Sequence, residues 1–246
     1  MPTRIGVPWL HPGATFPPTR YALDDPNGLL AIGNDLGVDT LLQAYRRGIF
    51  PWFSEGQPPL WWTPDPRLVL EPDAFHISRS LRKCLRRDPF QFSIDQAFTS
   101  VMSACAAPRD DQDGTWITDE MRDAYTALHH AGHAHSVEVW QGQQLVGGFY
   151  GVNLGAMFFG ESMFSRCANA SKAALALFCL LRNAHGVTLI DCQMETPHLL
   201  SLGARPVARV DFERALMERV CTDNAWHWPH ERASLAEYTA RYRLTI

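Results

Sequence analysis

The chain has 246 residues, a formal net charge of −4, 46 % hydrophobic residues and 20 % charged residues. This composition supports a folded core and excludes an intrinsically disordered chain. The longest apolar run, residues 173–181, is too short to span a bilayer, and the N-terminus has no apolar segment typical of a signal peptide. The six cysteines form no CxxC pair, which argues against a zinc ribbon or a redox motif. We therefore expect a soluble cytoplasmic protein with no metal and no cofactor.

The N-terminal quarter of the chain has an unusual composition. Residues 1–67 hold eleven of the 17 prolines and four of the eight tryptophans. Only one helix is predicted there, over residues 38–47, with Gly48 as its C-cap. A segment so rich in proline forms turns and few regular elements. We predict a small irregular N-terminal domain over residues 1–67 and a second domain over residues 68–246.

The second domain shows regular periodicity. Helices are predicted over residues 78–87, 95–106 and 118–130, with Ser78 and Asp95 as the N-caps of the first two. Segments 135–140 and 144–152 alternate and are joined by a glycine-centred turn, which predicts a hairpin that segment 156–164 extends. A helix over 171–185, ended by Gly186, precedes a buried strand over 187–193 and helices near 198–202 and 211–221. This order predicts an α+β fold with a mostly antiparallel sheet covered by helices, and it resembles the acetyltransferase-like (GNAT) superfamily.

Two clusters of charged or titratable side chains stand out. Four histidines lie between residues 129 and 135, but Gly132 ends the helix between them and no carboxylate or thiol sits at a familiar spacing, so we expect no metal site. Residues 78–87 carry five basic side chains at helical spacing, so that most share one face. This face is either solvated or a docking face for phosphates. The five residues are Arg79, Arg82, Lys83, Arg86 and Arg87.

A polar pair ends the apolar strand over 187–193. Strand alternation places Asp191 and Gln193 on one face, and Ile190 and Cys192 on the other. Two interpretations stay open. Both polar side chains pair with backbone, or the Asp191 carboxylate accepts a hydrogen bond from the Gln193 amide and so aims the amide oxygen into a cleft.

Glu161 lies inside an apolar strand segment. A carboxylate in such a place needs a cationic or hydrogen-bonding partner. Its neighbours Phe158, Met163 and Phe164 either pack in the core or line a pocket for an apolar side chain, a role that suits the adaptable methionine.

Ten motifs, in order over about residues 26–204, resemble those of the bacterial leucyl/phenylalanyl-tRNA–protein transferases. They are PNGLLA (26–31), YRRGIFPWF (45–53), LWWTPDPR (60–67), HISR (76–79), GTWIT (114–118), GHAHSVEVW (132–140), GESMFS (160–165), NASK (169–172), DCQ (191–193) and SLGA (201–204).

The resemblance implies a GNAT-like catalytic domain that transfers Leu or Phe, and Met less well, from aminoacyl-tRNA to proteins that begin with Arg or Lys. The product is an N-degron for Clp-type proteolysis, and the enzyme is expected to be a monomer without a cofactor. Asp191 and Gln193 match the family's catalytic pair, and Glu161 matches its pocket acid. The other substrate-binding residues are then Trp52 and Trp116, which contact adenosine, and the pocket residues Phe158, Met163, Ser165, Leu175, Phe178 and Ile190.

The chemistry agrees with this resemblance. The donor ester is already activated and a protein α-amine has a pKa of about 8, so neither a covalent nucleophile nor a metal is required. A Gln193 oxygen held by Asp191 can accept a hydrogen bond from the amine, with most of the rate coming from positioning. Stacking of the terminal adenosine on tryptophan contributes about 1–3 kcal/mol per base. The basic helix would bind acceptor-stem phosphates without reading sequence.

Two alternative functions would require different residues from those of an aminoacyl-tRNA transferase. An acetyl-CoA-dependent acetyltransferase needs a glycine-containing loop that cradles pyrophosphate, and residues 165–171, at the corresponding place, contain no glycine. A non-catalytic RNA- or degron-binding module would not need an oriented Asp191–Gln193 pair.

Overall fold

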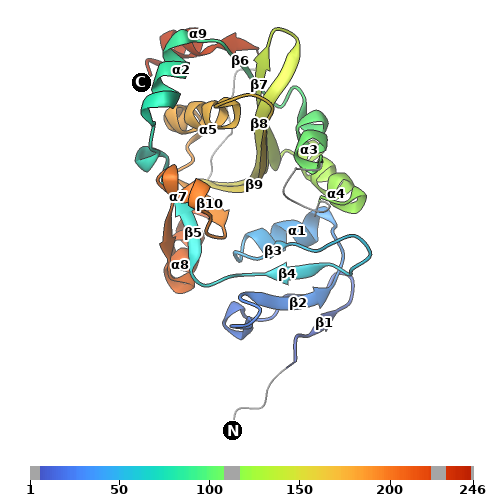
Figure 1. Ribbon diagram of the computed structural model, residues 1–246. Helices are drawn as coiled ribbons and strands as arrows, with labels where there is room; N and C mark the ends of the chain where they lie inside the picture. Colours follow the sequence, from blue (N-terminus) through green and yellow to red (C-terminus); the bar gives the residue numbers. More distant parts are fainter. Residues whose placement is uncertain (1–5, 108–116, 223–230, 245–246) are drawn as a thin grey trace.

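Two sheets organise the chain (Figure 1). The computed structural model describes residues 6–107, 117–222 and 231–244. The smaller sheet has four short strands in the order β1-β2-β4-β3, with β1 and β2 parallel and the other pairs antiparallel. The elements of this region are β1 (Trp9–Leu10), the 3-10 turn η1 (Thr19–Tyr21), β2 (Leu29–Gly33), α1 (Val38–Tyr45), β3 (Phe50–Pro51) and β4 (Leu60–Trp62).

The larger sheet has eight strands in the order β11-β5-β10-β9-β8-β7-β6-β12. Every neighbouring pair is antiparallel except β9 and β10, which are parallel. The strands are β5 (Arg67–Leu70), β6 (Gln91–Ile94), β7 (Ala134–Gln141), β8 (Gln144–Leu154), β9 (Met157–Ser165), β10 (Leu189–Gln193), β11 (Arg205–Val207) and β12 (Ala233–Ser234). The predicted hairpin is β7–β8, and β9 extends it as expected.

Helices cover both faces of the large sheet. They are α2 (Arg79–Arg87), α3 (Phe98–Ala106), α4 (Asp119–His130), α5 (Ala170–Leu180), α6 (Arg182–His185), α7 (Pro197–Ser201), α8 (Arg209–Val220) and α9 (Leu235–Tyr242), with the 3-10 turn η2 (Pro72–Ala74). One buried cluster joins the N-terminal sheet, α1, α3, α4 and α8, and a second lies around α5, α2 and α9 on the opposite face. The α+β class and the mostly antiparallel sheet are therefore confirmed. None of the helices in the described ranges combines the length and apolar character that crossing a bilayer requires.

Local signals placed most elements correctly. The Ser78 side chain accepts a hydrogen bond from the Leu81 backbone, as expected of the N-cap of α2. The four strands of the small sheet were not predicted, because segments of two to five residues are too short for alternation to show.

Three local predictions were wrong. Gly48 is not the C-cap of α1, which ends at Tyr45 with Arg46 as its cap. Asp95 is not the N-cap of α3, which begins after Ala97. The Asp95 carboxylate instead accepts hydrogen bonds from the Ser136 backbone and the His135 ring of β7, so a tertiary partner replaces the local cap. The helix predicted over 171–185 is interrupted at Leu181, which separates α5 from α6.

Candidate active site

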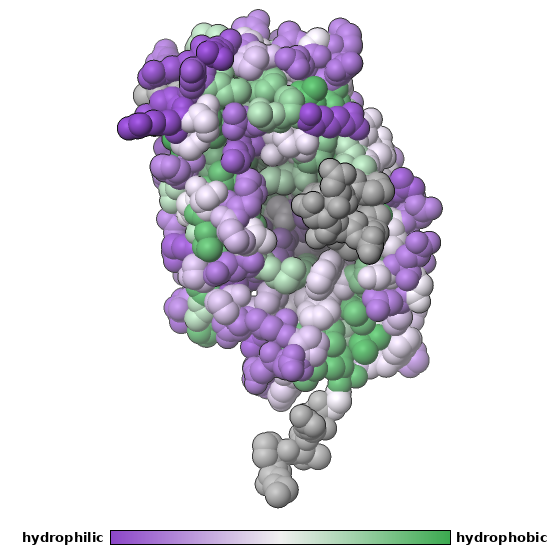
Figure 2. All heavy atoms as spheres, in the orientation of Figure 1, coloured by the Kyte–Doolittle hydropathy of each residue, from purple (hydrophilic) through white to green (hydrophobic). Residues whose placement is uncertain are grey.

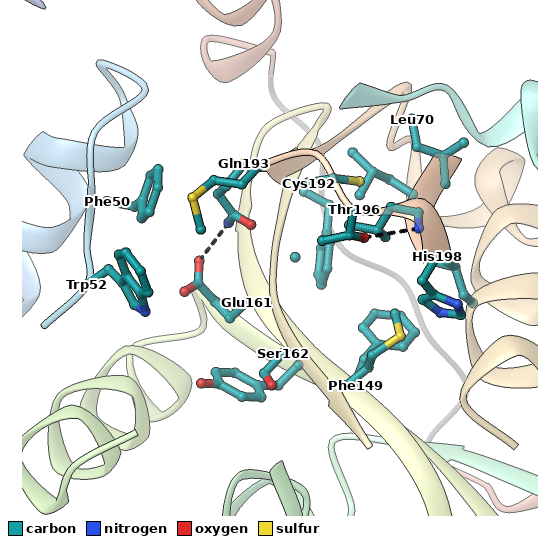
Figure 3. Close-up of a pocket in the computed structure, with 18 of the residues that line it drawn as sticks. Phe50, Trp52, Leu70, Phe149, Glu161, Ser162, Cys192, Gln193, Thr196 and His198 are labelled. Atoms are coloured by element: carbon teal, nitrogen blue, oxygen red, sulfur yellow. Dashed lines mark hydrogen bonds between the residues drawn. The ribbon is translucent and has the colours of Figure 1, made fainter. Parts of the chain in front are cut away.

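An apolar cavity of about 470 Å³ opens beside β9 and β10 (Figure 3). These strands pair over residues 157–159 and 189–191, and the cavity is lined by Phe158 and Ile190 within that pairing and by residues 160–163 and 192–194 beyond it. Its wall combines the N-terminal region, through Phe50 and Trp52, with the large sheet, α5 and α7. Seven of the residues predicted to form the site line it, namely Trp52, Phe158, Glu161, Met163, Leu175, Ile190 and Gln193.

Two predicted substrate-binding residues are placed differently, and a third is not described. Phe178 is fully buried behind the wall, with its ring centroid 4.7 Å from that of Phe158 and 5.5 Å from that of Phe149, so it supports the lining without forming it. Ser165 lies outside this cavity, where its hydroxyl donates to the Cys167 carbonyl. Trp116 falls outside the described residues.

Asp191 is fully buried at the end of β10 and forms an ion pair with Arg67 of β5. The guanidinium donates to both carboxylate oxygens, from Nε at 2.8 Å and from Nη2 at 2.6 Å. It lies between the rings of Phe50 and Phe212, about 4.8 and 4.7 Å from their centroids. The third donor to Asp191 is the backbone N–H of Gln193, at 3.0 Å from Oδ1. The carboxylate thus fixes the main chain that carries Gln193.

Of the two interpretations left open for the Asp191–Gln193 pair, the contact between the Asp191 carboxylate and the Gln193 side-chain amide is not formed. A bulge between the two residues puts Gln193 in the left-handed region, with φ 55°, and breaks the alternation that assigned the strand's faces. Ile190, Cys192 and Gln193 consequently line the same cavity. The Gln193 amide nitrogen lies 3.4 Å from Oε1 of Glu161, as the dashed line in Figure 3 shows. Glu161 therefore orients the amide, while Asp191 holds its backbone.

Glu161 is the centre of a hydrogen-bonded network with two tyrosines. Tyr45 of α1 donates to its Oε1 at 2.7 Å, and Tyr125 of α4 donates to its Oε2 at 3.0 Å. The two tyrosine hydroxyls also contact each other. Burial raises the pKa of Glu161 to about 7, an effect that the two hydroxyl donors oppose. Burial and the Glu161 charge raise the pKa of each tyrosine well above its usual value, so both hydroxyls keep their protons.

Trp52 stands at the rim of the cavity with 38 % of its surface exposed. Its ring meets that of Trp62 edge to face at 5.6 Å, and its carbonyl accepts the Trp62 indole N–H. An exposed, laterally supported indole can stack on a planar ligand without rearrangement.

The basic residues 79–87 form α2, which buries Leu81 and Leu85 and exposes all five basic side chains. None of the five forms an ion pair within the described ranges of the chain. The surface over α2, at the upper left of Figure 2, is strongly hydrophilic. The basic residues are Arg79, Arg82, Lys83, Arg86 and Arg87.

The histidines of residues 129–135 take part in packing and hydrogen bonds. The ring of His129 stacks on Phe98 at 4.2 Å and its Nδ1 contacts the Ala134 carbonyl. Nδ1 of His135 lies 2.7 Å from Asp95. Within the part of the chain that the structure describes, no three His, Cys, Asp or Glu side chains are grouped to hold a metal ion.

Sequence reasoning missed Arg67, Tyr45 and Tyr125. The first two lie in motifs that carry the family resemblance, but no local periodicity distinguishes them from core residues. An arginine in a buried strand needs an anionic partner, and the only signal for this pair was that Asp191 has the complementary need.

Comparisons with known proteins show which family the chain belongs to. The model of the family "Leucyl/phenylalanyl-tRNA protein transferase" matches residues 69–217, and the model of its N-terminal domain matches residues 34–65. A leucyl/phenylalanyl-tRNA–protein transferase of Azotobacter vinelandii is 56 % identical over 214 residues, which are 87 % of this chain and 95 % of the relative. One from Nitrosospira multiformis is 52 % identical over 229 residues, 92 % of this chain and 99 % of the relative.

Among solved structures, a GCN5-related N-acetyltransferase from Kribbella flavida aligns with a TM-score of 0.36 and 13 % identity, over 68 % of this chain and 60 % of that one. L-PGS from Bacillus licheniformis aligns with the same TM-score and 11 % identity, over 68 % of this chain and 53 % of that one. These similarities are too low to carry a functional inference.

An apolar side-chain cavity bordered by an oriented amide, together with the family matches, defines an aminoacyltransferase. Its donor is an aminoacyl-tRNA. The chain belongs to the leucyl/phenylalanyl-tRNA–protein transferase family.

Proposed function

We propose that the enzyme transfers Leu or Phe, and Met less well, to the N-terminal α-amine of proteins that begin with Arg or Lys. The product would be an N-degron for Clp-type proteolysis. The observation that carries the donor preference is the apolar cavity, whose wall includes Phe158, Leu175 and Ile190. Such a wall excludes charged side chains through their cost of desolvation. It favours Leu and Phe over Ile and Val, which branch at Cβ next to the reacting ester.

Gln193 is the residue that we place at the reacting amine. Its amide nitrogen points at Glu161, and no described residue donates to its Oε1, so this oxygen is available to accept a hydrogen bond from the acceptor amine. The neutral amine attacks the ester carbonyl, the C–N bond forms and the ester C–O bond breaks. The amine proton ends on the departing ribose oxygen. Positioning supplies most of the rate, because the ester is already activated.

Asp191 and Glu161 would act through Gln193. Asp191, locked by Arg67, holds the Gln193 backbone, and Glu161, locked by two tyrosines, sets the rotation of the amide. The carboxylate of Glu161 would also supply negative charge near the donor's α-amino group or the acceptor's basic side chain. With a pKa of about 7, it is partly ionised near neutral pH.

The remaining assignments concern the tRNA and the cell. Trp52, together with Trp116, would stack on the terminal adenosine, and α2 would bind acceptor-stem phosphates. We also propose the division into domains 1–67 and 68–246, which falls between the two family-model matches. The enzyme is expected to work as a monomer in the cytoplasm, where aminoacyl-tRNA is available.

The test is transfer of labelled Phe from Phe-tRNA to two versions of one acceptor protein, which begin with Arg or with Glu and are otherwise identical. Label should enter only the Arg version. Transfer from Leu-, Phe-, Met-, Ile- and Val-tRNA is then compared in parallel. Equal labelling of both acceptors, or no labelling of either, would contradict the proposed acceptor or the proposed reaction.

A further inference from the structure

A second cavity of about 450 Å³ adjoins the aminoacyl cavity. Met163 and His198 line both, so these two side chains form the partition between them. The second cavity is otherwise lined by the end of α3, the end of β9 and the start of α5, through Ser165, Arg166 and Ser171 among others. The described lining residues include a guanidinium and two hydroxyls but no carboxylate, which is the donor set that suits an anion.

Lys172 adds a second cation beside this cavity. It follows Ser171 in the first turn of α5 and is half-buried. Its ammonium group lies close enough to His198 that it helps burial to lower the pKa of that imidazole. Neither Lys172 nor Arg166 forms an ion pair with any residue that the structure describes. Among the described residues, the Arg166 guanidinium donates to the Leu145 carbonyl and lies over the Phe164 ring.

The position of these cations connects two parts of the proposed tRNA site. α7 contributes His198 and Leu199 to the aminoacyl cavity, and the residue after it, Leu202, accepts a backbone hydrogen bond from His76, three residues before α2. The start of α5, which carries Ser171 of the second cavity and Lys172, lies beside α2, because α2 packs against α5 and Cys84 of α2 interacts with Cys167 and Asn169 just before α5. Trp52 stands across the aminoacyl cavity from His198 in Figure 3. A nucleic-acid strand that runs from Trp52 to α2 would have to pass this point.

We propose that Lys172 and Arg166, with the hydroxyl of Ser171, bind a backbone phosphate of the single-stranded 3′ end of the donor tRNA. This inference rests on the proposed function, because its ligand is the donor of that reaction. A lysine is suited to this role, since a compact ammonium group binds a phosphate as a point charge without requiring a fixed orientation. The subsite would position the ester relative to Gln193, while α2 binds the stem further away.

The experiment compares three Phe donors that share the phenylalanyl-adenosine end and differ in the number of nucleotides, and hence of phosphates, attached to it. They are phenylalanyl-adenosine, which has none, the phenylalanyl trinucleotide CCA, which has only the 3′-end linkages, and whole Phe-tRNA. Lys172→Gln should lower kcat/KM about ten-fold for the trinucleotide and for tRNA, the loss expected for one charge-assisted hydrogen bond. Transfer from phenylalanyl-adenosine should change less than two-fold, and Lys172→Arg should restore most of the loss.

Two further variants separate this subsite from other effects of charge. Lys83→Gln removes the chain's only other lysine, on α2, and should weaken transfer from tRNA much more than from the trinucleotide. Arg214→Gln removes an exposed cation on α8 that is paired with Asp211, and should alter none of the three reactions.

An equal loss with phenylalanyl-adenosine would show that Lys172 supports the cavity without binding phosphate, and no loss with any donor would show that it does not contact the strand. Either result overturns the proposal. Transfer from phenylalanyl-adenosine by the wild-type enzyme tests the proposed function alone. The phosphate subsite is tested separately, by how much more Lys172→Gln lowers transfer from the trinucleotide than from phenylalanyl-adenosine.

Discussion

The buried ion pair between Arg67 and Asp191 gives the most demanding test of the site. Both side chains are almost completely inaccessible, and Asp191 accepts three hydrogen bonds, two from Arg67 and one from the Gln193 backbone. Removing one partner leaves the other charge buried without compensation, which costs about 3–5 kcal/mol. Arg67→Met and Asp191→Leu should therefore each lower the melting temperature by roughly 6–20 °C for a chain of this size.

The double variant should behave differently. With both charges replaced by apolar groups, the desolvation cost of the pair also disappears, so its stability should return to within about 2 kcal/mol of the wild type. The free energy of unfolding is measured by urea denaturation for all four members of the cycle. Wild-type stability in both single variants, or simple additivity in the double one, would refute the argument that the pair is buried and coupled.

The same cycle separates stability from catalysis. The double variant is folded but no longer holds the Gln193 backbone, so turnover should fall on the order of 10²-fold while tRNA binding stays nearly normal. Gln193→Ala buries no charge and should lose turnover without losing stability. Wild-type turnover in both variants would remove Asp191 and Gln193 from the mechanism.

Three further predictions follow from the site. Burial raises the pKa of Glu161 from 4.5 to about 7, so the folded state holds a proton that the unfolded state loses, and the free energy of unfolding should fall as the pH rises from about 4.5 to 7. Glu161→Gln should flatten this pH dependence, measured by urea unfolding between pH 5 and 8. An unchanged pH dependence in the variant would contradict the raised pKa. Phe158→Ala should reduce Leu and Phe transfer relative to Ile and Val transfer, because it removes contacts from an apolar wall where a methylene-sized difference is worth about 1–3 kcal/mol. An equal loss with all four aminoacyl-tRNAs would mean that this wall does not select the amino acid. Replacing four basic residues of α2 by Ala should weaken the binding of all aminoacyl-tRNAs about equally. The slope of log K against log salt concentration should become less steep by up to about 0.9 for each lost phosphate contact. An unchanged slope would show that α2 is only a solvated helix face. The four residues of that variant are Arg82, Lys83, Arg86 and Arg87.

Several features of this protein were determined by the sequence alone. Helix periodicity, N-caps such as Ser78 and the glycine-centred turn of the β7–β8 hairpin are local signals, so they survive without knowledge of the fold. The ten family motifs predicted the family that the comparisons then showed. They included the acid, the amide and a part of the apolar wall, through Phe50, Trp52 and Met163, that the structure brings to one cavity.

The tertiary structure decided how these residues are connected. The bulge turns the Gln193 side chain away from the face that strand alternation assigns to it, and no residue in the strand itself encodes the bulge. The Asp191 carboxylate and its partner Arg67, 124 positions away, hold the bulge in place. Likewise, Tyr45 and Tyr125 meet at Glu161 only because α1 of the N-terminal region packs against α4. A buried charge must find its partner wherever the fold supplies one, and such partners lie far apart in the chain. Spacing in the sequence therefore showed which residues needed partners, and only the packing of distant elements determined which ones they received.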